Sequence, residues 1–451
     1  MALLTLAANA VLAVFGLLFL GLFVASAAAS GAFTKPVDTK KKNARLQARS
    51  ELWDLSSRPL PGFRHRFYEA EDGVNLHYVE GGDTSPDSPL VVFIHGFPDS
   101  WFIWHHQLSL PAIQQAHLIA VDLPGYGGSD CHPKASATAV LTSLTNFVLA
   151  QKEKKETERC ILVTHDWGSV VGFRLASEVG FLFDRCIILN ALHPPLALEN
   201  ATRAISSASK ILRAYLRSPG NLALLRSAWR SLRPLLMQLR SSYYVSVFLL
   251  PRPLARLPLK MGDFWFLRLA SRLAKSRNEE AHLASALGPS ASEVEGYPAS
   301  VRTRQDVNRR ADCMIAYYRG NLAWGRWNKP EHIQLLCAAA DTNSGFTGLL
   351  KRKEGSMGCP VTIVYSKRDR AFHRRFCFEG LEEYLCSSKG GRGKGSYLVC
   401  LPRAGHWPMT ASPGRESVEA LIECALDVAE GEETKQRVWG VDKDVVFEIE
   451  K

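Results

Sequence analysis

The stretch Ile161-Leu162-Val163-Thr164-His165-Asp166-Trp167-Gly168-Ser169 decides the fold of this chain. Four apolar or β-branched residues run into a polar pair, and small residues follow where a helix would begin. The pattern predicts a strand, a sharp turn and a helix, with Asp166 at the corner. A carboxylate there suits attack on a saturated carbon, because the ester that it forms can be cleaved by water. An aspartate that merely caps a surface helix would look similar, so the surrounding chain has to separate the two interpretations.

Strands and helices alternate around this turn. Short apolar runs predict strands buried on both faces, and an Asp-Gly pair at 72–73 predicts a hairpin ahead of them. The alternation is typical of the α/β class, a mostly parallel sheet with helices on both faces. In such sheets the functional site lies at the carboxyl ends of the strands, where His95, Asp122 and Asp166 fall. The expected strands are 63–70, 74–79, 90–94, 117–121, 161–164, 186–189, 359–365 and 397–401, and the expected core helices are 136–150, 169–179 and 416–428.

An inserted module interrupts this alternation. From His193 the sequence becomes helical and rich in arginine, and strand patterns return only at Cys359. We therefore divide the chain into a core at 61–192 and 331–430, a helical cap at 193–330 and a charged C-terminal tail at 431–451.

Positive charge is concentrated in this cap. Residues 195–330 contain 22 Lys and Arg against 8 Asp and Glu, whereas the whole chain carries a net charge of +11. No nucleic-acid-binding motif accompanies the charge, so we expect no nucleic-acid partner. A surface that lies near anionic lipid headgroups would account for it. A solvated, incidentally basic helical surface is the alternative.

Residues 2–33 contain no charged side chain and are long enough to cross a bilayer as a helix. Seven Lys and Arg follow within 34–60, a basic linker, and positive charge favours the cytosolic side of a membrane. We expect residues 1–33 to be a single-pass anchor in the endoplasmic reticulum, with the remainder of the chain in the cytosol. A signal peptide cleaved near Ala27-Ala28-Ala29 is the alternative.

The ten cysteines form no CxxC pair and no ligand-spaced group with histidine. We interpret them as mostly buried thiols, with no need for a disulfide and no zinc site. No metal or organic cofactor is expected.

Two residues far along the chain complete a nucleophilic site with Asp166. Such a site needs a nucleophile, a base and a group that orients the base. Asp369 follows one expected strand and His406 follows the last one. The order nucleophile, acid, histidine is that of α/β-hydrolases. Backbone N–H groups of Phe97 and Trp167 would form the oxyanion hole.

Four motifs together resemble the epoxide hydrolase family of α/β-hydrolases, in its membrane-anchored single-domain form. The resemblance covers roughly 60–430 and implies hydrolysis of an epoxide to a diol through an ester on the aspartate. It also implies two cap tyrosines that bind the epoxide oxygen, and substrate contacts by His95, Pro98 and Trp407. The motifs are His95-Gly96-Phe97-Pro98, the Asp-Leu-Pro-Gly-Tyr-Gly-Gly-Ser-Asp run at 122–130, His165-Asp166-Trp167-Gly168-Ser169 and Gly405-His406-Trp407.

The second cap tyrosine of the resemblance corresponds to Tyr318, in Met314-Ile315-Ala316-Tyr317-Tyr318-Arg319. The first is less well matched. Tyr244 is favoured and Tyr243 is the alternative; the third possibility is that neither tyrosine has this role. The expected partners are a small-molecule epoxide, water, and a membrane through the anchor and the basic cap. A hydrophobic, lipid-like epoxide is expected, in lipid metabolism or detoxification.

Two other functions fit parts of the sequence. A haloalkane dehalogenase shares the Asp-Trp pair at the nucleophile turn but does not need cap tyrosines. A catalytically silent, membrane-tethered binding protein could retain the same fold. The nucleophile position carries no hydroxyl, which argues against a lipase or esterase with a serine nucleophile.

Overall fold

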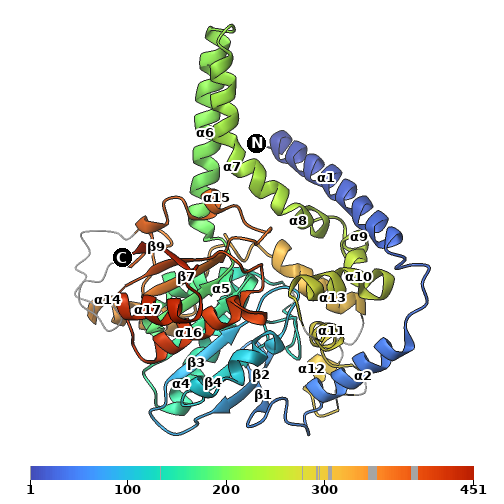
Figure 1. The fold of residues 1–451 in the computed structure, drawn as a ribbon, viewed down its shortest axis with the longest axis vertical. Helices are drawn as coiled ribbons and strands as arrows, with labels where there is room; N and C mark the ends of the chain where they lie inside the picture. The colour runs from blue at the N-terminus through green and yellow to red at the C-terminus, as the bar shows by residue number, and fades with distance from the viewer. Residues whose placement is uncertain are drawn as a thin grey trace.

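The computed structural model describes residues 2–132, 134–276, 278–290, 293, 295–302, 307–343, 353–386 and 395–451. Its centre is a nine-stranded sheet in the order β1-β2-β4-β3-β5-β6-β7-β8-β9 (Figure 1). The six strands from β4 to β8 pair in parallel, whereas β1, β2 and β9 are antiparallel to their neighbours. The mostly parallel sheet predicted from the sequence is therefore confirmed. The strands are β1 (Arg64–Glu69), β2 (Asn75–Gly82), β3 (Leu90–Ile94), β4 (His117–Val121), β5 (Cys160–His165), β6 (Arg185–Leu189), β7 (Val361–Ser366), β8 (Tyr397–Leu401) and β9 (Val446–Glu450).

Two apolar layers lie on the two faces of this sheet. Alternate residues of β3 and β5 point to opposite faces, so Val92 and Leu162 join one layer while Phe93 and Val163 join the other. The first layer holds α4 (Ala137–Lys155) and α5 (Trp167–Glu178) together with much of the cap. The second holds α16 (Gly414–Leu426) and the short helix Trp101–Trp104. Because β5 lies in the middle with β3 and β6 on either side, the turn that follows it is at the centre of the molecule.

The inserted segment is helical, as expected, and its first two helices form a long hairpin that projects from the body (Figure 1). A kink at Met261–Phe264 interrupts α10, where three residues adopt left-handed backbone angles. The cap helices are α6 (Pro194–Arg217), α7 (Leu222–Ser241), α8 (Tyr243–Phe248), α9 (Arg252–Ala255), α10 (Leu257–Leu273), α11 (Glu279–Leu287), α12 (Ala299–Arg302) and α13 (Val307–Arg319), followed by α14 (Glu331–Asn343). The core also contains the short helices α3 (His105–Leu108) and α15 (Arg374–Phe378).

The segments expected to be linker and tail are both folded. Within 34–60, α2 (Thr39–Trp53) packs on α11, and the fully buried Trp53 donates its Nε1–H to the Ala284 carbonyl at 3.2 Å. Within 431–451, α17 (Glu432–Val441) packs on α16 and β9 pairs with β8. The sequence did not predict these elements, because the few apolar residues that pack are spread through charged sequence. The expected linker and tail are therefore corrected to parts of the folded body.

A disulfide corrects the expectation for the cysteines. Cys131, in the loop after β4, is bonded to Cys313 in α13, 182 residues further along the chain. No sequence motif marks this pair, because the fold alone brings the two together. Among the eight free cysteines of the described residues, Cys337 and Cys386 are partly buried and the other six are buried.

The apolar helix α1 (Ala2–Ala29) lies against the cap. Its residues 10–29 are apolar and long enough to cross a membrane. One face nevertheless packs on α8 and α10, where the Phe19 and Tyr243 rings are 4.7 Å apart and the Phe23 and Phe266 rings 5.4 Å apart. Gly16 permits close packing, since a Cβ there would lie 2.6 Å from the Ser246 carbonyl. The remaining faces of α1 expose large apolar side chains.

Candidate active site

Asp166 lies on a sharp turn between β5 and α5. Its φ is +50°, a conformation that non-glycine residues rarely adopt, and its side chain is only 8% exposed. The turn needs glycine on both sides. A Cβ on Gly96 would lie 2.4 Å from the Asp166 Cβ, and one on Gly168 would lie 2.4 Å from the His95 carbonyl. The small residues noted in the sequence therefore allow the nucleophile turn to pack against the end of β3.

His406 connects the two carboxylates that the sequence assigned to the site. Its Nδ1 lies 2.7 Å from Asp369 Oδ2, and its Nε2 lies 3.5 Å from Asp166 Oδ2. The hydrogen bond to Asp369 fixes Nδ1 as a donor, so Nε2 faces the nucleophile. The structure therefore brings Asp166, His406 and Asp369 together in the arrangement of a nucleophile, a base and an orienting acid.

The two carboxylates control the charge of His406. Burial lowers the pKa of His406, but the negative charges of Asp369 and Asp166 outweigh it and raise this pKa to about 10. Burial raises the pKa of Asp166, but His406 and the Phe97 N–H lower it overall. At neutral pH the site therefore holds a carboxylate nucleophile beside an imidazolium.

One of the two expected oxyanion donors contacts the nucleophile. The Phe97 N–H donates to Asp166 Oδ1 at 2.8 Å. Trp167 is the first residue of α5, so its N–H belongs to the free N-terminal turn of that helix. No bond from the Trp167 N–H to the Asp166 side chain is present among the described contacts, and its part in an oxyanion hole stays a prediction.

Tyr318 stands over the nucleophile turn. Its ring packs 5.0 Å from the Trp167 ring and 5.5 Å from the Phe97 ring. Its hydroxyl is buried and has no hydrogen-bond partner of ordinary geometry among the described residues. Burial, with Tyr244 and Asp166 nearby, raises the pKa of Tyr318 well above its usual value, so the phenol keeps its proton.

The other two tyrosines, Tyr243 and Tyr244, lie in different surroundings. The Tyr244 ring lies 6.0 Å from the Tyr318 ring, and burial followed by the charge of Asp166 raises the pKa of Tyr244. Tyr243 instead packs on Phe19 and Phe23 of α1. Tyr244 is therefore the tyrosine of the pair that faces the nucleophile.

The three residues expected to bind substrate are hydrogen-bonded within the protein or buried. His95 is fully buried; its Nδ1 donates to the Gly96 carbonyl and its Nε2 accepts from the Leu123 N–H. Neither ring nitrogen is free for a substrate, so the expected role of His95 is corrected to holding the loop after β3. Trp407 donates its Nε1–H to Asp99 at 2.8 Å, and Pro98 is buried after a cis peptide bond.

Sequence reasoning missed several polar residues that hold the site. Asp99 accepts hydrogen bonds from Trp407 Nε1 and from His282 Nε2 of α11, each at 2.8 Å. Asn190 donates to the His406 carbonyl at 2.7 Å and accepts from the Ser366 N–H at 2.8 Å. His165 lies 2.8 Å from that same carbonyl through Nε2. The position of Asn190 and Asp99 at strand ends was the one available signal.

The glycine-rich run after β4, at 122–130, holds the same loops in place through Asp122. Asp122 accepts from the N–H groups of Trp101 and Gly128, and from His77 Nδ1 at 2.8 Å. A Cβ on Gly127 would lie 2.1 Å from the Asp122 carboxylate. The run is therefore a tight turn beneath the site. Within the described residues, no three His, Cys, Asp or Glu side chains form a group suited to a metal ion.

Comparison with known proteins gives consistent results. The profile of the family described as "Alpha/beta hydrolase family" matches residues 91–420. "Epoxide hydrolase 2" of Caenorhabditis elegans is 34% identical over 136 residues, which cover 30% of this chain and 37% of that protein. "Epoxide hydrolase 4" of Mus musculus is 30% identical over 171 residues, 34% of this chain and 46% of that one. The matches thus span less than half the length of these relatives.

Among solved structures, an epoxide hydrolase from Bacillus megaterium superimposes with a TM-score of 0.50 at 21% identity. The match covers 80% of this chain and 100% of that one. It supports the fold, whereas the sequence relatives support the epoxide hydrolase resemblance drawn from the motifs.

Proposed function

This chain belongs to the alpha/beta hydrolase family, and on that basis we propose that it is an epoxide hydrolase that acts through an ester on Asp166. The observation that carries the proposal is the placement of a buried carboxylate nucleophile, with His406 and Asp369 on one side and the hydroxyl-bearing Tyr318 on the other. A carboxylate attacks a strained saturated carbon, and a buried phenol without a partner is suited to protonate or bind the oxygen that leaves.

In the first step, Asp166 attacks one epoxide carbon and the C–O bond of the ring breaks. Tyr318 and Tyr244 donate hydrogen bonds to the departing alkoxide, which takes a proton from one of these phenols. The product is a hydroxyalkyl ester of Asp166. Both phenols keep their protons at neutral pH because burial raises the pKa of each.

In the second step, His406 removes a proton from water, and the hydroxide attacks the ester carbonyl of Asp166. Esterification has by then removed the negative charge of Asp166, one of the two charges that raise the His406 pKa. Its pKa therefore falls in the intermediate, so His406 gives up the proton that it carried at rest, and this proton restores the phenol. The neutral imidazole then acts as a base while Asp369 still orients it. The Phe97 N–H, already bound to Asp166 Oδ1, stabilises the oxyanion together with the Trp167 N–H, and the diol leaves.

Mass spectrometry of the enzyme with a trapped substrate tests this scheme. In His406→Gln the ester should accumulate as an adduct on the peptide that contains Asp166, because the hydrolytic step lacks its base. In Asp166→Ala the adduct should be absent. An adduct that persists without Asp166 would overturn the assignment of the nucleophile.

The first rival is halide displacement. A haloalkane would use the same Asp166 and the Trp167 indole, but it would give no role to two tyrosines above the site. Halide release from chlorinated and brominated alkanes, measured beside diol formation, separates the two reactions. The second rival, a silent binding protein, would show no turnover across a panel of epoxides.

We further propose a hydrophobic, lipid-like substrate that reaches the site from a bilayer. Tyr243 contacts α1 while its neighbour Tyr244 faces the site, and Phe266 contacts both Phe23 and Phe97. Contacts between aromatic residues thus connect the apolar helix α1 with the site. Fatty-acid epoxides should be turned over with a higher kcat/KM than small polar epoxides, and equal values would contradict this.

For location, we propose that α1 is a single-pass anchor in the endoplasmic reticulum with the catalytic domain in the cytosol. The apolar length of residues 10–29 supports the anchor, and the basic residues that follow support the orientation. The Cys131–Cys313 disulfide argues against a cytosolic catalytic domain, because disulfides persist in oxidising compartments.

A further inference from the structure

The described hydrogen bonds that join the α6–α7 hairpin (Pro194–Ser241) to the body lie at its base. There, Asn200 Nδ2 donates to the carbonyls of Phe376 and Glu379, and Gln238 Nε2 donates to the Ala371 carbonyl. Beyond this base the two helices pack on each other and project past the body, on the side of the molecule where α1 lies (Figure 1). Among the described residues, no hydrogen bond or ion pair joins residues 205–236 to the body.

The charge of the hairpin is strongly positive and largely unpaired. Residues 194–241 contain eight Lys and Arg and a single acidic residue, Glu199. Glu199 pairs with Arg203 at 2.7 Å. The other seven basic side chains form no ion pair with the described residues. They are Lys210, Arg213, Arg217, Arg226, Arg230, Arg233 and Arg240.

Apolar and basic residues form adjacent stripes along each helix. In α7, Leu222, Trp229 and Leu236 recur every seven residues, and Arg226, Arg233 and Arg240 recur with the same period four residues later. A seven-residue step returns to nearly the same side of a helix, so each set forms a stripe. In α6 the exposed Leu198, Ile205, Leu212 and Leu216 likewise share one side.

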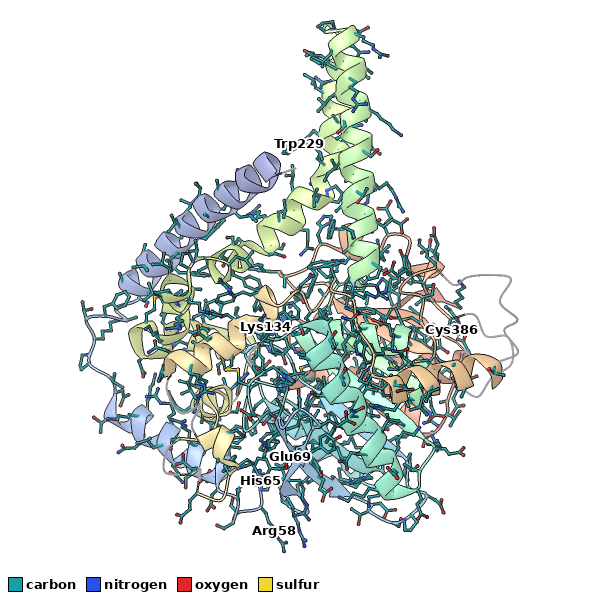
Figure 2. The ribbon with its side chains drawn as sticks, turned by 180° about the vertical axis from the view of Figure 1, so that it is seen from behind. Arg58, His65, Glu69, Lys134, Trp229 and Cys386 are labelled. Atoms are coloured by element: carbon teal, nitrogen blue, oxygen red, sulfur yellow. A yellow bond between two sulfur atoms is a disulfide. The ribbon has the colours of Figure 1, made fainter. Side chains whose placement is uncertain are left out.

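These apolar side chains are unusually exposed for their size. Leu216 is 75% exposed and Trp229 is 60% exposed. Figure 2 shows Trp229 on the part of the hairpin that projects from the body. Apolar stripes flanked by arginine match the boundary of a bilayer, where tryptophan and leucine enter the acyl region while arginine reaches anionic headgroups. Nucleic acid would satisfy the charges but would leave the leucines in water.

We propose that the α6–α7 hairpin is a second membrane-docking element, which lays its apolar and basic stripes on an anionic lipid surface next to the anchor. The inference rests on the proposal that α1 lies in a membrane and is independent of the epoxide chemistry. The docked hairpin would hold the cap, and with it Tyr244, at the surface from which an apolar substrate arrives.

Hydrogen exchange of the full chain in lipid nanodiscs tests this. Nanodiscs of phosphatidylcholine alone are compared with nanodiscs that contain 30% phosphatidylserine. Amides of residues 205–236 should exchange at least tenfold more slowly in the anionic discs. The variant R226Q/R230Q/R233Q should lose this protection, whereas the matched control R58Q/R64Q/K443Q, with three exposed charges removed elsewhere, should keep it.

The apolar stripe has its own variant. Trp229→Ser with Leu216→Ser should also lose the protection while the charges remain. Turnover of a water-soluble epoxide in detergent should be unchanged in every variant, which separates a failure of docking from a failure of the enzyme.

Three results would overturn the proposal. The first is equal exchange in both kinds of disc, and the second is loss of protection in the control variant. The third is protection of the hairpin by a nucleic-acid duplex at the same salt concentration. A chain that does not co-elute with the discs at all would instead contradict the anchor role of α1.

Discussion

Tyr317 and Tyr318 are neighbours with different tasks, and this difference can be measured. The Tyr317 hydroxyl donates to the Pro124 carbonyl at 3.0 Å, whereas the buried Tyr318 hydroxyl has no hydrogen-bond partner of ordinary geometry among the described residues. Tyr318→Phe should slow ester formation by about 10²–10³-fold, the effect of removing one donor from a developing oxyanion. Tyr317→Phe should leave that rate unchanged and lower the free energy of unfolding by about 1 kcal/mol.

Rapid-quench kinetics of the adduct and denaturant unfolding supply the two measurements. Both substitutions keep the aromatic ring, so packing is matched. A Tyr318→Phe enzyme that forms the ester at the original rate would remove this residue from the mechanism. Tyr244→Phe should behave as Tyr318→Phe does, because the two rings stand 6.0 Å apart over the same turn.

The raised pKa of His406 predicts a dependence of stability on pH. Its folded pKa is about 10, after the carboxylates Asp369 and Asp166 overcome the effect of burial, whereas an unfolded histidine has a pKa of about 6.5. The folded state binds this proton more tightly, so the contribution is fully present below about pH 6.5 and is lost as pH rises through 10. The difference in unfolding free energy between wild type and His406→Gln should shrink by roughly 4 kcal/mol from pH 6 to pH 10.

Other groups titrate in this range, so the comparison with His406→Gln is essential. Asp369→Asn serves as a second variant, since it keeps the histidine and removes one of the two charges that stabilise the imidazolium. A gap that stays constant with pH would show that His406 is not an imidazolium in the resting enzyme.

The residues of the triad could be predicted because each follows a strand whose apolar run is easy to recognise. Asp166, Asp369 and His406 come after β5, β7 and β8, and parallel strands bring their ends to one edge. Asn190 occupies the same kind of position, but its contacts with Ser366 and His406 depend on register and loop shape. Those properties are not written in local sequence, and the left-handed φ of Asn190 is equally invisible there.

Among elements, Asp99 connects the loop after β3 with cap helix α11 and with the loop that carries His406. It is fully buried and bound by both His282 and Trp407. Asp99→Ala leaves the donors of His282 and Trp407 without their acceptor, and an unpaired buried polar group commonly costs about 1–3 kcal/mol. We expect the free energy of unfolding to fall by that amount in chemical denaturation.

Hydrogen exchange should show where the loss of Asp99 acts. The amides of α11 and of the loop around Trp407 should exchange faster, while those of β5 and β6 should change only as global stability does. His282→Gln provides the matched control, because it retains a donor toward Asp99 and should cost less. Uniform acceleration over the whole sheet would argue against a local connecting role.

The elements themselves were predictable to different extents. The strands that read as apolar runs, such as β3 and β4, lie where the sequence placed them, because both of their faces are buried. The edge strand β9 was missed, since only alternate residues of Val446-Phe447-Glu448-Ile449-Glu450 need to be apolar at an edge. Helix α2 was missed for a similar reason: Lys40, Lys41 and Lys42 dominate its sequence while Ala48, Leu52 and Trp53 pack.

For the molecule as a whole, two features give opposite indications of the side of the membrane on which the core lies. The basic residues after α1 favour a core in the cytosol, where thiols are kept reduced. The Cys131–Cys313 bond joins the core to α13, the helix of Tyr317 and Tyr318, and is expected where the compartment is oxidising. We expect the charge pattern to set the orientation, so that Cys131 and Cys313 are thiols in the cell.

Sealed microsomes that contain the full chain decide between the two. With the core outside the vesicles, added trypsin should degrade residues beyond 34, and an alkylating reagent should label the partly exposed Cys131 without prior reduction. The buried Cys160 and Cys186, which should react only after denaturation, mark vesicles whose protein has unfolded. A core that resists trypsin until detergent is added, with Cys131 labelled only after reduction, would reverse the proposed orientation. The disulfide would then stabilise the cap in the resident protein by about 2–4 kcal/mol, rather than forming only on exposure to oxidant.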